Sequence, residues 1–358
     1  MPSARREIAV IQRFLPSRSR GGVGHFTHGL CQTLTRRGHR VTVFSEDPAP
    51  AGARYAVRQV GTARRGVRAR LAPLFFPFAL RRCDFTPFEV IHAQGDDQFL
   101  PRRRPPLVRT MHGTALAEAW FNGLRGGSLK RFGMHVFFYA MECLADLRAD
   151  YVVTVSAHTR RFYPRTHAVI PNGVDLDALA RGDATKSPAP SVLFVGELLT
   201  RKRGQFLLDV MARDVVPRVP AAELWLVSPD AADRPWTRCY RGVDDATVAD
   251  LMKRAWVMCL PSTYEGFGRP YIEAMAAGTA VVASPNAGAR EVLNEGADGV
   301  IAPDADLGAA LLRLLSSREE RERLEARGLA RSRLFGWDTV AAQYERVYEH
   351  AIGNRARA

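Results

Sequence analysis

Residues 260–284 read LPSTYEGFGRPYIEAMAAGTAVVAS, and they predict a strand, a loop, a helix and a second strand in that order. The apolar run 256–262 forms the first strand. Pro270 suits the first turn of a helix, where its missing N–H needs no partner, and Gly278 is expected to end that helix. Apolar strands joined by a helix are typical of a parallel sheet that is covered by helices.

The same alternation of apolar runs and helical patterns extends over the whole chain. It predicts further strands at residues 8–14, 40–45, 88–94, 107–113, 151–156, 167–175, 191–197, 222–229 and 279–285. An amphipathic helix from about Val23 to Arg37 follows the first of these strands and ends at Gly38. The polar, proline-bearing segment 180–190 interrupts the pattern and has the composition of a linker.

These elements predict an α/β protein with two domains, residues 1–170 and residues 171–337. A chain of 358 residues is long enough for two domains of ordinary size. The C-terminal segment 338–358 contains an amphipathic helix from about Asp338 to Ile352, which suits packing on either domain.

Arginine gives the first third of the chain a strong positive charge. Residues 1–110 contain 20 arginines, no lysine and 7 acidic residues, which accounts for +13 of the formal net charge of +14. Such a surface attracts phosphates, nucleic acid or an acidic membrane face. A solvated arginine-rich surface explains the same composition. Because no helix-turn-helix, zinc-finger or RNA-binding signature is present, no nucleic acid is expected as a partner.

The cysteines and the N-terminus indicate a reducing compartment. No CxxC spacing links the five cysteines, which are Cys31, Cys83, Cys143, Cys239 and Cys259. Their odd number disfavours a disulfide framework. The run IAVIQRFL reads as a strand and not as a signal peptide, and no apolar stretch nears the roughly 18 residues of a membrane-spanning helix. We therefore expect a cytoplasmic protein.

Two carboxylates, Glu265 and Glu273, stand eight positions apart around the central loop. Gly266 and Gly268 let the backbone approach a ligand, and the N–H groups at the following helix start favour a phosphate. We place Glu265 in the loop and Glu273 in the first helical turn, both available to sugar hydroxyls. A nucleotide sugar, with phosphates between two hydroxyl-rich groups, satisfies the whole stretch. The alternative is that Glu273 only favours the helix dipole and Glu265 is solvated.

A second candidate for binding an anion is the segment 194–208, FVGELLTRKRGQFLL. A strand and a glycine lead there to Arg201, Lys202 and Arg203 at a predicted helix start. Cations at that place oppose the helix dipole, and a bound anion relieves the cost. A solvated basic turn is the alternative interpretation.

Two features of the first domain also lie where ligands bind. The glycine-rich segment SRGGVGHF (19–26) does not match the GxGxxG fingerprint, but as a loop it suits approach to a phosphate. His112 ends a predicted strand, and ligands of parallel α/β sheets bind at the C-terminal ends of strands. A structural hydrogen-bonding role for His112 is equally open. No GxSxG, HExxH or P-loop motif and no metal-ligand spacing is present.

Taken together, these segments resemble the retaining glycosyltransferases of family 4. The likeness covers nearly the whole chain and rests on GGVGHF, the strand-end HG, VIPNGVD, FVGELLTRKRG, the stretch quoted at the outset and the following GAREVL. Within it, EGFGRPYIE is the family's E-x7-E motif. The resemblance implies the GT-B fold, in which two Rossmann-like domains face each other across a cleft. The first domain binds the acceptor, and the second binds the nucleotide sugar.

The resemblance also implies roles for single residues around the E-x7-E motif. Glu265 is expected to bind hydroxyls of the donor sugar. Glu273 is expected to accept hydrogen bonds from the ribose hydroxyls. The backbone N–H groups of Gly266, Phe267 and Gly268 are expected to meet the sugar and the diphosphate.

Further roles fall on residues outside the motif. Gly22 is expected to approach the diphosphate from the first domain. The backbone around Val243 is expected to read the base. His112 is expected to lie near the reacting sugar.

One departure from the family pattern concerns the cations that hold the diphosphate. The family commonly has an arginine directly after the glycine of the FVG strand, and Glu197 stands there. The lysine that usually precedes the next glycine is replaced by Arg203. We expect Arg203 to contribute most to binding the diphosphate, and Lys202 to contribute second.

The implied reaction is transfer of a sugar from a nucleoside diphosphate sugar to an acceptor hydroxyl, with retention. Cations and helix N–H groups stabilise charge on the leaving phosphate, so neither a metal nor another cofactor is expected. The catalytic candidates are Glu265, His112 and Arg203. A nucleotide-sugar epimerase or a phosphorylase shares the fold; the E-x7-E context disfavours the first and the chain length the second. A basic nucleic-acid-binding protein is the remaining alternative.

The acceptor is not readable from the sequence, and a lipid-linked acceptor, a polysaccharide precursor and a natural product stay open. The segment 63–82, ARRGVRARLAPLFFPFALRR, places arginines around Phe75, Phe76 and Phe78. This pattern suits docking on an anionic membrane, which fits a lipid-linked acceptor at the inner membrane face. An acceptor-binding lid and a buried core helix are the other two interpretations.

Overall fold

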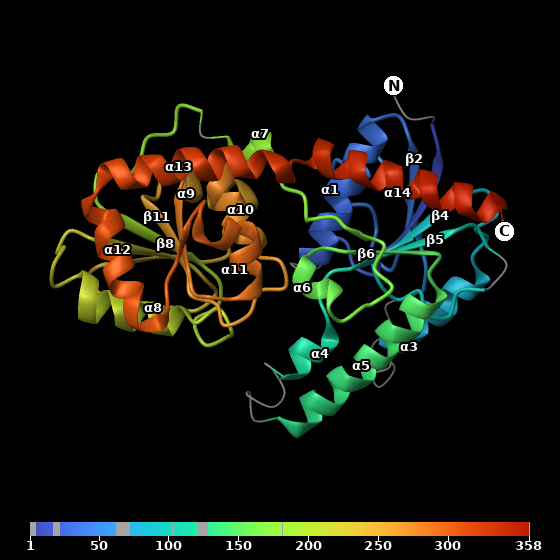
Figure 1. Cartoon of the computed structure of the whole chain (residues 1–358), viewed down its shortest axis with the longest axis horizontal. Coiled ribbons are helices and arrows are strands. Elements are labelled where there is room, and N and C mark those ends of the chain that lie inside the picture. The colour runs from blue at the N-terminus through green and yellow to red at the C-terminus, as the bar shows by residue number, and fades with distance from the viewer. Residues whose placement is uncertain are drawn as a thin grey trace. The chain divides into compact units, whose positions relative to one another are not determined.

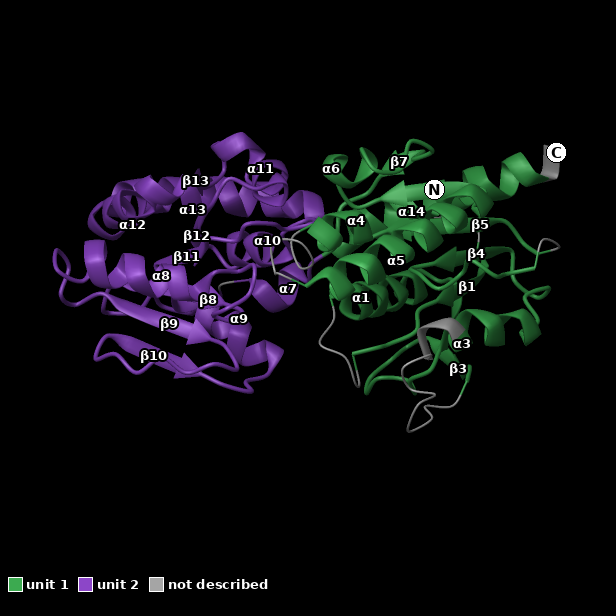
Figure 2. Cartoon of the chain, turned by 90° about the horizontal axis from the view of Figure 1, so that it is seen from below, with its two compact units in different colours: residues 1–173, 337–358 green, residues 174–336 purple. Residues whose placement is uncertain are grey.

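The chain divides into two compact units, which Figure 2 distinguishes by colour. The computed structural model describes residues 5–16, 22–61, 72–101, 104–120, 128–180 and 182–357. Unit 1 comprises residues 1–173 and 337–358, and unit 2 comprises residues 174–336. The domain boundaries expected from the sequence were 170/171 and 337/338. In the structure, residues 337–358, which include the last helix, are part of unit 1.

Unit 1 is built on a parallel sheet that has, within the described residues, the strand order β3-β2-β1-β4-β5-β6-β7 (Figure 1). The strands are β1 Glu7–Ile11, β2 Arg40–Ser45, β3 Ala56–Gln59, β4 Val90–Ala93, β5 Leu107–Met111, β6 Tyr151–Thr154 and β7 Ala168–Val169. The helices are α1 Gly22–Arg36, α3 Ala72–Ala79 with the 3-10 turn Leu80–Arg82, α4 Ala115–Glu118, α5 Leu129–Arg148, α6 Ala157–Arg160 and α14 Trp337–Arg357.

The side chains of β1 show why both faces of this sheet are covered. Successive residues of a strand point to opposite faces. Ile8 and Val10 enter a core that includes residues of α1 and α14, whereas Ala9 and Ile11 enter a second core that includes residues of α3. The near-continuous apolar runs of the sequence are therefore strands buried on both sides.

Helix α14 crosses the strands of unit 1 beside α1 (Figure 1). Tyr344 and Tyr348 are fully buried beneath it. Its polar anchor is Glu345, which accepts a hydrogen bond from Arg37 Nε at 2.7 Å and lies 3.0 Å from His39 Nε2. Burial works to raise the pKa of Glu345, but the hydrogen bonds from Arg37 and His39 outweigh it and the pKa is lowered.

We expect Glu345→Gln to destabilise the protein by about 1.5–3 kcal/mol, because a charged hydrogen-bonded group is lost from a buried position. A carboxylate with a lowered pKa stabilises the fold above its unfolded pKa, and this contribution disappears as the pH falls through the folded pKa. The difference between variant and wild type in urea unfolding should therefore shrink in acid. Glu349→Gln, at an exposed position of the same helix, is the control. An equal loss in both variants would contradict the assignment.

Unit 2 is built on a second parallel sheet, with the order β10-β9-β8-β11-β12-β13 among its described residues. The strands are β8 Ser191–Val195, β9 Glu223–Val227, β10 Thr237–Tyr240, β11 Val257–Leu260, β12 Ala280–Ala283 and β13 Val300–Ile301. The helices are α7 Leu176–Leu179, α8 Gly204–Val210 continued by the π-turn Met211–Val215, α9 Asp245–Arg254, α10 Arg269–Ala276, α11 Ala287–Val292, α12 Leu307–Ser316 and α13 Arg318–Ser332, with 3-10 turns at Asn294–Gly296, Asp304–Asp306 and Arg333–Phe335.

The predicted strands are present, but the sequence missed three edge strands, β3, β10 and β13. Each lies at the edge of its sheet, and two of them read AVRQ and TRCY, so neither has the apolar run that marks a buried strand. The predicted strand 167–175 is reduced to the two residues of β7. None of the helices in the described part of the chain combines the length and apolar character needed to span a bilayer.

Candidate functional site

The predicted site in unit 2 centres on the loop between β11 and α10, at the C-terminal edge of the sheet. Strand β11 ends at Leu260, and α10 begins at Arg269, directly before Pro270. Gly268 precedes the helix with a left-handed φ of 92°. A Cβ atom at Gly268 would come within 2.5 Å of the Tyr271 ring, so both conformation and space require glycine there. The loop therefore enters α10 by a tight turn of the backbone.

Glu273 lies one residue beyond the helical turn that the sequence predicted. We placed it in the first helical turn, but α10 starts at Arg269 and Glu273 is its fifth residue. The left-handed Gly268 starts the helix one residue before Pro270 and thus moves Glu273 into the second turn. Its carboxylate pairs with Arg269 Nε at 2.7 Å, and both side chains are partly exposed.

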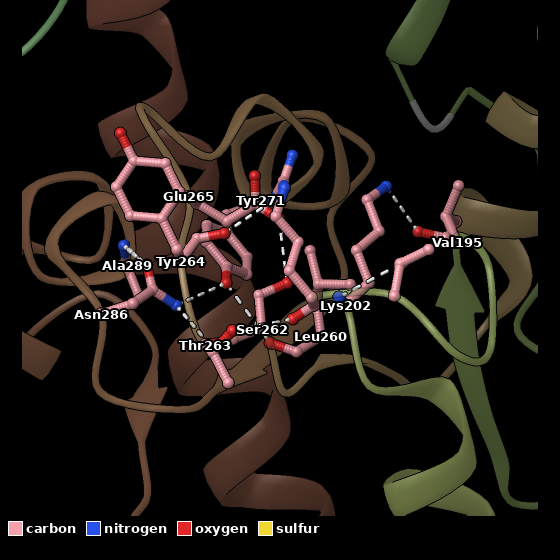
Figure 3. A network of polar contacts seen from close by, with 12 residues as sticks. Val195, Lys202, Leu260, Ser262, Thr263, Tyr264, Glu265, Tyr271, Asn286 and Ala289 are labelled. Atoms are coloured by element: carbon pink, nitrogen blue, oxygen red, sulfur yellow. Dashed lines mark hydrogen bonds and ion pairs between the residues drawn. The ribbon is translucent and has the colours of Figure 1, made fainter. Parts of the chain in front are cut away.

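Glu265 is buried in the loop and is not a solvated side chain, since only 6% of its surface is exposed. Its Oε1 accepts a hydrogen bond from Ser262 Oγ at 2.9 Å and pairs with Arg201 Nη1 at 2.7 Å (Figure 3). Both contacts reach the same carboxylate oxygen. The carboxylate is thus fixed from one side, which suits a group that accepts hydrogen bonds from a ligand.

Residues outside the motif hold this loop in place. Asn286 Oδ1 caps α11, and its Nδ2 donates to Ser262 O at 3.1 Å and to the Tyr271 hydroxyl at 3.2 Å (Figure 3). Thr263 N donates to Arg201 O at 2.9 Å. Sequence reasoning missed these supports. The signal for Asn286 was its position directly before the helix AGAREV, where asparagine is a preferred cap.

Lys202 lies over Gly196, the glycine that follows β8. Its Nζ donates to Val195 O at 2.9 Å (Figure 3). Gly196 has φ of 154°, and a Cβ atom there would come within 2.2 Å of Lys202 Cδ. Because Gly196 has no Cβ atom, the side chain of Lys202 can pack directly against its backbone.

The ammonium group of Lys202 is mostly buried. Burial lowers its pKa, the neighbouring Arg201 lowers it further, and Glu265, Glu273 and Glu197 act in the opposite direction. Lys202 therefore lies in the electrostatic field of both glutamates of the motif. An anion bound beside it would favour the protonated ammonium.

Arg203 has different partners. It caps the N-terminus of α8 with a left-handed φ of 57°. Its Nη2 pairs with Asp304 at 2.7 Å, and its guanidinium lies 4.1 Å from the centre of the Phe206 ring. The side chain of Glu197 is exposed. Of the predicted cations, the structure brings Lys202 into the field of the two glutamates and gives Arg203 an acidic partner elsewhere in unit 2.

The remaining predicted residues lie in both units. Val243 is half-buried in the loop between β10 and α9 of unit 2, and Phe267 is buried with its ring 6.0 Å from that of Phe335. Gly22 is the first residue of α1 in unit 1, and residues 17–21 of the preceding glycine-rich segment lie outside the described residues. His112 directly follows β5 in unit 1, as predicted.

His112 is a partly buried, neutral imidazole. Its Nε2 lies 2.7 Å from Gln94 Oε1, and the Phe26 ring contacts it edge-on at 4.8 Å between centroids. Burial and the charge of Arg109 lower its pKa to about 3, although a hydrogen bond with Asn172 works to raise it. At neutral pH His112 therefore carries no charge, and its ring offers one N–H donor and one acceptor nitrogen.

Comparison with known proteins identifies the fold and the family of the chain. The family model "Glycosyltransferase Family 4" matches residues 20–178, and "Glycosyl transferases group 1" matches residues 189–317. The structure is similar to that of sucrose-phosphate synthase from Thermosynechococcus elongatus, with a TM-score of 0.79 and 20% identity over 98% of this chain and 100% of the other. The two parallel sheets and this likeness define the GT-B class. The two family matches together take in most of the chain, which belongs to glycosyltransferase family 4.

Two relatives show how far the likeness extends. The chain is 39% identical over 209 residues to phosphatidyl-myo-inositol mannosyltransferase of Mycobacterium tuberculosis. The aligned region covers 52% of this chain and 55% of the relative. The chain thus spans about half the length of the curated relatives that it matches first. It is 28% identical to D-inositol 3-phosphate glycosyltransferase of Xylanimonas cellulosilytica, over 94% of this chain and 93% of the relative.

Proposed function

We propose that this protein transfers a sugar from a nucleoside diphosphate sugar to an acceptor hydroxyl, with retention of configuration and without a metal. The observation that carries the proposal is the place of Lys202, whose ammonium is bonded to Val195 O at the end of β8 and lies in the electrostatic field of Glu265 and Glu273. A diphosphate neutralises the ammonium and meets the N–H groups of the helix start. The sugar and the ribose then reach the two carboxylates. Membership of family 4 supports the same reaction class.

The chemistry follows from where charge develops. The bond between the anomeric carbon and the phosphate oxygen breaks, and negative charge grows on the leaving diphosphate. Lys202 and the N–H groups of α10 stabilise that charge most in the transition state. The acceptor oxygen attacks from the same face, and its proton goes to the leaving phosphate. Neutral His112 is not required as a base, in keeping with its lowered pKa.

The acceptor that we propose is carried on a lipid, at an anionic membrane surface. The predicted docking segment 63–82 lies only partly in the described residues, since 62–71 are outside them; in α3, Phe75 and Phe78 are exposed. The first turns of α5, which lies on the outside of unit 1 (Figure 1), expose Leu129, Val136 and Phe137. Residues 129–141 include Lys130 and Arg131 and no acidic residue. Exposed apolar groups beside cations favour an anionic interface.

We expect Phe137→Ser to reduce sedimentation of the full-length protein with vesicles of phosphatidylglycerol and phosphatidylcholine. The phenylalanine, 46% exposed, offers apolar area to the acyl boundary, and serine offers almost none. Leu199→Ser is the matched control, because Leu199 is 86% exposed and lies in unit 2. Equal sedimentation of both variants and wild type would exclude this surface. A change in oligomeric state on substitution would assign α5 to a contact between copies.

The transfer reaction itself is tested by release of free nucleoside diphosphate. Uridine, guanosine and adenosine diphosphate sugars are first compared by thermal shift, and the donor that stabilises the protein is then incubated with lipid extract. We expect release of the diphosphate to depend on the extract and to persist in EDTA. The anomeric proton signal of the product reports the configuration by NMR. If none of the donors raises the melting temperature and none is consumed, the proposal is wrong.

A further inference from the structure

We propose that Gln94 is a positioning residue for His112, and that the C-terminal helix α14 holds Gln94 through His92. The inference rests on the proposed function, because that function places His112 near the reacting sugar. All of the residues involved belong to unit 1. They are buried polar side chains that lie at the C-terminal ends of β4 and β5 and on α14.

Hydrogen bonds join His112 to α14 through Gln94. Gln94 Oε1 lies 2.7 Å from His112 Nε2, and Gln94 Nε2 lies 3.0 Å from His92 Nε2. His92 Nδ1 lies 2.7 Å from the Tyr348 hydroxyl. Thr110 Oγ1 lies 2.8 Å from His92 Nε2 and 3.0 Å from the Tyr344 hydroxyl. Two tyrosines of the last helix are thus linked to a histidine at the end of β5.

The chemistry of the glutamine amide assigns the tautomer of both histidines. An amide oxygen only accepts, so His112 carries its proton on Nε2 and donates it to Gln94. The amide nitrogen only donates, so His92 Nε2 is an acceptor and its proton lies on Nδ1, which donates to the Tyr348 hydroxyl. The single lone pair of His92 Nε2 then faces two donors, the amide of Gln94 and the hydroxyl of Thr110, which share it. Thr110 Oγ1 in turn accepts from the Tyr344 hydroxyl.

Burial keeps the rings of His92 and His112 neutral, so their protonation can differ only in which ring nitrogen carries the proton. The pKa of His92 is lowered to about 3 by burial and by His112. The pKa of His112 is lowered to about 3 as well. With its Nε2 proton committed to Gln94, the Nδ1 of His112 carries no proton, and the side chain of Asn172 is a second hydrogen-bonding partner of this ring. Without Gln94, the ring is free to exchange tautomers and to present a donor where the reaction needs an acceptor.

We expect Gln94→Leu to lower kcat about 10- to 100-fold while the donor KM changes less than twofold. The physical reason is loss of a fixed hydrogen-bonding group at the reacting centre. In nitrogen-15 NMR of the full chain, His112 should change from one Nε2-protonated species to a mixture of tautomers. Gln98→Leu, a buried glutamine of the same loop, controls for the loss of a buried amide and should leave the signal of His112 unchanged.

Gln94→Glu separates positioning from packing. A glutamate keeps an oxygen that accepts from His112 Nε2, so most of kcat should return at high pH. Its carboxylate also raises the pKa of His112, and a pH dependence of kcat that the wild type lacks should appear. Tyr348→Phe removes the direct link from α14 to His92, leaves the one through Tyr344 and Thr110, and should produce a smaller tautomer change in the same direction.

Two outcomes overturn the inference. An unchanged His112 tautomer in Gln94→Leu would show that Gln94 does not fix the ring. A tautomer change with unaltered kcat would show that the position of His112 is irrelevant to turnover. The NMR measurement needs no substrate. If the proposed function were wrong, the tautomer change in Gln94→Leu would still be observed, which distinguishes that failure from the two outcomes above.

Discussion

Glu265→Gln is expected to lower kcat with saturating donor by about 10²- to 10³-fold, the loss typical of removing one preorganised group at a site of developing charge. Glutamine keeps the size of the side chain and one oxygen for Ser262. It removes the charge that pairs with Arg201 and the lone pairs that a sugar hydroxyl would meet. The measurement is the initial rate of diphosphate release at several donor concentrations.

Two further variants make the Glu265 result specific. Glu273→Gln should mainly raise the donor KM, because Glu273 is partly exposed in the second turn of α10 and is proposed to bind ribose. Glu295→Gln, which is exposed and pairs only with Arg290 in the described structure, should change neither parameter. Full turnover in Glu265→Gln would show that the carboxylate does not take part in the reaction.

Lys202→Met is expected to lower kcat/KM about 10²-fold without loss of stability. A lysine whose folded pKa is lowered costs stability at neutral pH, because the unfolded chain binds its proton more readily. The methionine variant should therefore unfold at the same or a higher temperature in the absence of donor. A substitution that keeps the fold and loses the reaction identifies a functional cation. Retained activity would indicate that Arg203, which the sequence favoured, and not Lys202 binds the diphosphate.

The matched comparison for this cation is Arg203→Ala. Because Arg203 pairs with Asp304, we expect a smaller loss of activity there than in Lys202→Met. Donor binding should also take up a proton once the pH exceeds the lowered pKa of Lys202, since a diphosphate favours the charged form. Calorimetry in two buffers of different ionisation enthalpy measures this uptake. Lys202→Arg should abolish it, and equal uptake in both proteins would exclude Lys202 as the titrating group.

The sequence predicted the fold wherever burial leaves a pattern. The strand, loop and helix around Glu265 followed from an apolar run, two glycines and Pro270. The edge strands β3 and β10 escaped prediction because an edge strand need not be apolar on both faces. Glu273 falls one residue beyond the predicted first turn because the left-handed Gly268 starts the helix before Pro270, and the sequence does not show a backbone dihedral angle.

The site was predictable as a set of segments and not as a set of contacts. The cluster TRKRG marks an anion site, but the sequence does not show that Arg201 pairs with Glu265, Lys202 with Val195 O and Arg203 with Asp304. The link from Gln94 to Tyr348 joins residues 254 positions apart, through a histidine 256 positions from its tyrosine. Such contacts arise from the topology of the sheet and leave no local pattern.

The return of the last helix to unit 1 sets an order on the synthesis of the chain. Unit 2 is continuous in sequence, so all of its residues have been synthesised once Gly336 has been added. Unit 1 is not, because its core includes Val340, Tyr344 and Ala351. During translation, the first unit to be made is therefore the last whose core is complete. Until α14 has been synthesised, the apolar side chains of α1 that pack against it in the finished core lack that contact.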